Sequence, residues 1–79
     1  MTGKDRLTPV DAQGFLIQSI ETDDQKGIAR TYALAMRDHW HVDWKQANEA
    51  VIASRGPAAL TAIKTRAWKI VEGKVAFDD

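Results

Sequence analysis

The stretch that most constrains the fold of this chain is residues 43–73, which carries helix start and stop signals at both ends. Asp43 can accept a hydrogen bond from the free N–H groups of a first helical turn, and Gln46 completes a capping-box pattern. Gly56 suits the backbone conformation that ends a helix, and the proline after it suits the first position of the next helix. The sequence therefore predicts two helices that meet at a tight corner over residues 54–57. An antiparallel hairpin and a helix-turn-helix crossing both remain open.

Apolar side chains recur every three to four residues on both of these helices, as expected where one face of each helix is buried. Helices of three or four turns do not persist alone in water, so these faces must pack against the rest of the molecule. The buried positions predicted on the two helices are Trp44, Ala47, Ala50, Val51 and Ser54, then Leu60, Ile63, Ala67, Ile70 and Val71.

The same signals predict two helices upstream. The first is expected over residues 9–20, with Thr8 as its cap, and the second over residues 24–39, with Thr22 and Gln25 as a capping-box pair. The buried positions predicted on them are Val10, Leu16, Ile17 and Ile20, then Ile28, Tyr32, Ala35, Met36 and His39.

The predicted fold class is all-α, a small bundle of four short helices joined by short loops. With 79 residues the chain is expected to form a single helical domain over 1–79, with flexible ends at 1–7 and 74–79. A chain of this size buries about 60–65% of its unfolded surface, so its stability depends on close packing or on a second subunit.

The composition argues against several classes of protein. Eleven Lys and Arg residues balance eleven Asp and Glu residues, so the whole chain has no strong field for nucleic acid or anionic lipid. There is no cysteine, which fits the predicted cytoplasmic location. No apolar run resembles a signal peptide or approaches the ~18 residues of a membrane span, so we expect no membrane partner.

No motif for catalysis is present. Ser19 and Ser54 lie within predicted helices and outside any nucleophile motif, and the glycines stand singly rather than in a phosphate-binding loop. The acidic residues gather at helix caps and in the tail. We therefore expect a non-enzymatic protein with no cofactor and no small-molecule substrate.

The cluster richest in metal-ligand side chains is residues 38–43. His39 and His41, with Asp38 and Asp43 beside them, offer the imidazole and carboxylate ligands that zinc and nickel accept. Both aspartates already have roles at helix ends, and His39 falls in phase with the buried stripe. The interpretation we prefer is a structural loop without metal, and these two histidines are the candidates if a metal is bound.

Basic residues are concentrated in the second half of the chain. Residues 44–74 carry six basic and two acidic residues, and some of the bases share one face of the last predicted helix. Bases on a helix beside a tight corner are typical of helix-turn-helix DNA-binding proteins. On this alternative hypothesis the DNA contacts would be Arg55, Lys64, Arg66 and Lys69. A solvated helix face explains the same residues without DNA.

Three large apolar residues fall outside the predicted stripes, namely Phe15, Leu34 and Trp68. Large apolar residues exposed on a chain this small indicate a partner surface, and a second copy of the chain is the first candidate. The opposing interpretation is that the bundle encloses all three. The sequence thus predicts a helical interaction or regulatory module that self-associates through these residues, with DNA binding as the alternative.

Overall fold

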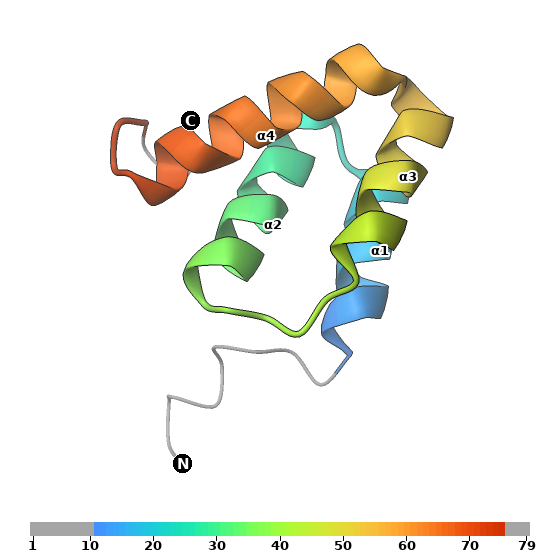
Figure 1. Cartoon of the computed structure of the whole chain (residues 1–79), viewed down its shortest axis with the longest axis horizontal. Helices are drawn as coiled ribbons and strands as arrows, with labels where there is room; N and C mark the ends of the chain where they lie inside the picture. The colour runs from blue at the N-terminus through green and yellow to red at the C-terminus, as the bar shows by residue number, and fades with distance from the viewer. Residues whose placement is uncertain (1–10, 76–79) are drawn as a thin grey trace.

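The computed structural model describes residues 11–75, and the predicted all-α fold is confirmed there. No strand occurs within these residues. The four helices are α1 (Ala12–Thr22), α2 (Gln25–Arg37), α3 (Trp44–Arg55) and α4 (Pro57–Val71) (Figure 1).

The helices contact one another in a ring rather than as a parallel bundle. α1 packs on α2, α2 packs on α4, α4 packs on α3, and α3 packs on α1. α1 lies behind α3 in Figure 1, and α4 runs across the upper ends of the other helices. The backbones of α2 and α3 stay apart, so long side chains have to bridge the space between these two helices.

Gly56 is the single residue between α3 and α4, and its φ of 94° lies in the region that favours glycine. A side chain added there would meet no atom within 4 Å, so backbone conformation rather than space requires the glycine. The predicted corner is therefore confirmed. The two helices diverge steeply and do not form an antiparallel hairpin (Figure 1). The one-residue link is also shorter than the three- or four-residue turn of a helix-turn-helix.

An aspartate caps each of the first three helices by accepting a hydrogen bond from the backbone N–H three residues later. The donor–acceptor distances are 2.9 Å for Asp11 and Gly14, 2.8 Å for Asp24 and Gly27, and 3.1 Å for Asp43 and Gln46. Only the third of these caps was predicted. Aspartate competes better than threonine for such positions, which explains why the caps predicted for the first two helices were wrong.

The predicted boundaries of the first two helices need correction. α1 begins at Ala12 rather than at residue 9, and Thr8 and Pro9 lie outside the described residues. Thr22 does not cap α2, because its hydroxyl donates to the Gln18 carbonyl oxygen at 2.8 Å and belongs to the last turn of α1. α2 ends at Arg37, so His39 is not part of the buried stripe; it is exposed, with a φ of 57°.

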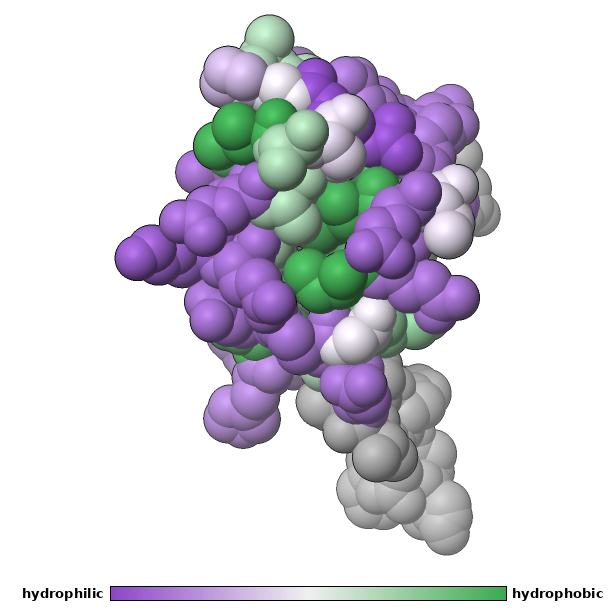
Figure 2. All heavy atoms as spheres, turned by 90° about the vertical axis from the view of Figure 1, so that its right-hand side faces the viewer, coloured by the Kyte–Doolittle hydropathy of each residue, from purple (hydrophilic) through white to green (hydrophobic). Residues whose placement is uncertain are grey.

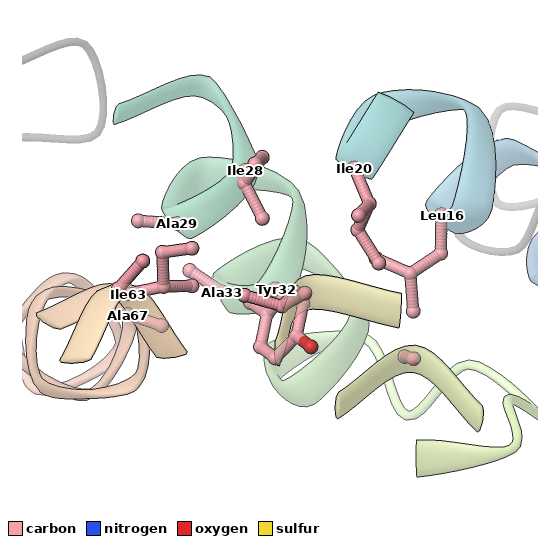
Figure 3. Close-up of a cluster of buried hydrophobic side chains, with 11 residues drawn as sticks. Leu16, Ile20, Ile28, Ala29, Tyr32, Ala33, Ile63 and Ala67 are labelled. Carbon is pink, nitrogen blue, oxygen red and sulfur yellow. The ribbon is translucent and has the colours of Figure 1, made fainter. Parts of the chain in front are cut away.

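The main core lies where α2 meets the other three helices (Figure 3). Alanines of α2 and α4 let these two helices approach closely, and Ile63 of α4 lies among them. Tyr32 is the largest fully buried side chain. The buried cluster consists of Leu16, Ile20, Ile28, Ala29, Tyr32, Ala33, Ala47, Val51, Ala59, Ile63 and Ala67.

A second buried cluster forms around Trp40, which lies between α2 and α3. The Trp40 side chain is buried against Ala12 and Ala35, and its backbone N–H donates to the Ala35 carbonyl oxygen at 2.9 Å. The ring of Phe15 meets Trp40 edge-on, with 5.8 Å between the ring centroids. Leu34 packs against the same cluster and is half-buried.

Hydrogen bonds made by side chains join α1 to α3 at both ends. Near the start of α1, Gln13 accepts from the backbone N–H of Asp43 and donates to the Gln46 side chain at 2.7 Å. Gln46 therefore bonds to α1, in place of the predicted return bond to the Asp43 backbone.

The side of the molecule that shows these two helices is mostly hydrophilic, with hydrophobic atoms visible in its middle (Figure 2).

At the other end of α1, Arg55 donates to the carbonyl oxygens of Ile20, at 3.3 Å, and Asp23. These carbonyls lie at the helix C-terminus, where a positive charge is favoured by the helix dipole. The guanidinium of Arg55 thus ties the end of α3 to the end of α1.

Candidate protein-binding groove

A hollow of about 370 Å³ lies between α2, α3 and α4. We call it the Trp68 groove and define it by the six residues that line it: Tyr32, Met36, Trp44, Asn48, Lys64 and Trp68.

Each of the three helices supplies two side chains to this groove, spaced four residues apart. Residues i and i+4 of a helix lie one above the other on the same face, so each pair forms one continuous strip of wall. The hollow exists because the α2 and α3 backbones stay apart while both helices pack against α4 or α1. Its shape therefore depends on the packing of the whole fold.

Tyr32 anchors the buried side of the groove. Its hydroxyl donates to the Asn48 side-chain oxygen at 3.0 Å, and its ring meets Trp44 edge-on with 5.1 Å between centroids. Burial raises the pKa of the Tyr32 phenol from 10.0 to about 12, because a buried phenolate would lose its hydration. The phenol is therefore neutral at physiological pH, and Asn48 retains its NH₂ donors for other partners.

The outer side of the groove is apolar and exposed. Trp68 has 54% of its surface exposed, and Trp44 is half-buried. Ile52, with 43% of its surface exposed, lies one turn beyond Asn48 on the same strip of α3. Exposed apolar groups beside a hollow are characteristic of sites where proteins bind other molecules.

The helices that form the groove are strongly basic. Together α2, α3 and α4 carry eight Lys and Arg residues, and Glu49 is their one acidic residue. The whole chain has eleven basic and eleven acidic residues. Its acidic residues other than Glu49 therefore lie outside these three helices, in caps, loops, α1 and the ends of the chain. Lys64 brings one of these positive charges to the groove itself. The groove therefore carries a positive charge and lies among helices with an excess of basic residues.

The four residues predicted to contact DNA lie in different surroundings. Arg55 is bonded to the end of α1, as described above. Lys64 lines the Trp68 groove, whereas Arg66 lines a second hollow of about 300 Å³ beside Gln25 and Lys26. Lys69 is exposed on α4 and lines neither hollow. These four basic residues therefore do not all line one hollow.

The three residues predicted to form a protein interface are also separated. Phe15 and Leu34 both pack near Trp40, and Trp68 borders the groove. Phe15, with 47% of its surface exposed, and Trp68 point outward, while the bundle partly encloses Leu34. Phe15 and Trp68 are thus exposed, and their contact with a partner remains a prediction.

The other candidate residues form no recognisable site among residues 11–75. His39 and His41 are both exposed, and no group of three or more His, Asp or Glu residues in this part of the chain is placed to hold a metal ion. The Ser19 hydroxyl is buried and bonded to Asp23 and Thr31, so it is part of the contact between α1 and α2.

Four groove residues were not recognised as a site from the sequence. Tyr32, Met36 and Trp44 were predicted only as core positions, and Asn48 was not singled out. The available signal was the i, i+4 spacing of large side chains on three different helices. That signal becomes specific only when the relative positions of the helices are known.

Comparisons of the chain with protein-family models, with curated protein sequences and with solved structures gave no match. Among the described helices, none has the length and apolar character needed to cross a membrane.

Proposed function

We propose that this protein is a non-enzymatic helical interaction module that self-associates through the surface around the Trp68 groove. The observation that carries the proposal is the exposed Trp68 side chain beside a hollow with aromatic walls. Tryptophan is the residue most enriched at the energetic centres of protein interfaces, because it buries a large apolar area with little loss of side-chain freedom.

The chemistry of the groove supports binding rather than catalysis. Lys64 is the only residue lining it that is charged at neutral pH, and the Tyr32 phenol is held neutral by burial. General acid–base catalysis needs a group whose pKa lies near the working pH, and burial moves the pKa of Tyr32 further from that range. Apolar walls with a few polar groups suit the side chains of a protein partner.

Self-association is expected to make the average mass rise with protein concentration above the 8.8 kDa of one chain. Trp68→Ala should bring the mass back towards that of the monomer, because the exposed indole would no longer be buried in a contact. Light scattering over a wide concentration range measures this. Thr65→Ala, an exposed change on the same helix outside the groove, is the control. A wild-type mass of one chain at every concentration would contradict the proposal.

DNA binding is the second candidate, and the excess of eight bases over one acid on α2, α3 and α4 favours it. In this case Lys69→Ala should weaken binding to all sequences alike and reduce the slope of log K against log salt by about one. A mobility-shift titration with a DNA duplex at several salt concentrations measures both effects. The absence of a shift at low salt would eliminate this candidate.

A further inference from the structure

We infer that two different surfaces of the chain meet in this self-association: the Asp11–Phe15 strip of one copy binds the Trp68 groove of the next. The inference rests on the proposed function and says which two surfaces of the chain make the contact. Its basis is the exposure, spacing and charge of two pairs of residues, one pair at the start of α1 and one on α4.

The first surface is the outward face at the start of α1. Phe15 has 47% of its surface exposed, and its edge-on contact with Trp40 holds the ring in place. Asp11 is also exposed and precedes α1 as its N-cap, four residues before Phe15. One of its carboxylate oxygens caps α1 through the Gly14 N–H.

The second surface is the border of the groove on α4. Trp68 has 54% of its surface exposed, and the exposed Lys64 lies four residues earlier. The hollow beside them, at about 370 Å³, is large enough to admit an aromatic side chain. An acid and an aromatic ring at the start of α1 thus match a base and an aromatic ring on α4.

The distribution of charge favours contact between unlike surfaces. Residues 11–24 carry four acidic residues and no basic residue, whereas α2, α3 and α4 carry eight basic residues and one acidic residue. A symmetric contact between two grooves would place Lys64 and the basic residues around it against the same residues of the second copy. A contact between two α1 strips would likewise place acidic residues of one copy against acidic residues of the other. Only the head-to-tail arrangement pairs opposite charges.

A head-to-tail contact leaves one surface of each type free after every addition, so it continues into rings or chains. The wild-type mass should therefore rise with concentration without stopping at a dimer. Since the contact rests on opposite charges, added salt should lower the mass.

Mixing two variants tests the inference directly. Phe15→Ala retains the groove and lacks the aromatic ring on α1, while Trp68→Ala retains the α1 strip and lacks the indole. Each variant alone should have the mass of one chain. An equimolar mixture should form a species of twice 8.8 kDa and nothing larger, because neither variant can extend the chain. Sedimentation velocity measures these masses, and circular dichroism confirms that both variants are folded.

Other outcomes would overturn the inference in distinguishable ways. If the wild-type chain associates but the mixture remains monomeric, the head-to-tail geometry is wrong and the proposed self-association survives. The same conclusion follows if Phe15→Ala associates as the wild-type chain does. If the wild-type chain is monomeric at every concentration, self-association itself is wrong.

Discussion

Replacing Ile63 by alanine should lower the free energy of unfolding by about 2–5 kcal/mol. The Ile63 side chain is 1% exposed and lies on α4 among the alanines of the main core. Because these alanines already bring α2 and α4 close together, the helices have little room to move inward and fill the space left by the lost methyl groups. The expected cost therefore includes both the lost burial and a remaining cavity.

Ile52→Ala provides a matched control, because it makes the same chemical change on a side chain with 43% of its surface exposed. Its effect on stability should stay within about 0.5 kcal/mol, as is usual for surface positions. Urea unfolding followed by circular dichroism measures both variants. A loss below half a kcal/mol for Ile63→Ala, or equal losses for the two, would show that the assignment of buried and exposed faces is incorrect.

Raising the pH from 10 to 12 should reduce stability by about 2 kcal/mol through Tyr32 alone. In the unfolded chain the phenol ionises near its ordinary pKa of 10.0, whereas burial in the folded chain raises the pKa to about 12. The folded state therefore holds the proton more tightly. The stabilisation is fully present below pH 10 and is lost as the pH rises towards 12.

The chain has one tyrosine, so the absorbance change on phenolate formation reports on Tyr32 without interference from another phenol. Tyr32→Phe removes the ionisable group and keeps the ring that packs against Trp44. Subtracting the stability profile of Tyr32→Phe from that of the wild-type chain isolates the contribution of the Tyr32 phenol. A folded-state phenol that titrates near pH 10 would show that Tyr32 is not buried as described.

Features that depend on neighbours along the chain could be predicted from the sequence. The Asp43 cap and the Gly56 corner were both predicted, because each depends on backbone groups within four residues. The buried positions Val51, Ile63 and Ala67 were predicted as well, since the 3.6-residue period determines which side chains share a face. Where two local signals competed, as at Thr8 and Asp11, the prediction was wrong because sequence spacing alone does not rank them.

Only the tertiary structure decided how the faces of the four helices meet. Periodicity defines a direction around each helix axis, but it says nothing about the angle or distance between two axes. The steep corner between α3 and α4, the burial of Trp40 and the separation of Phe15 from Trp68 all depend on those quantities. The Trp68 groove depends on them too, because it occupies the space left where the α2 and α3 backbones stay apart.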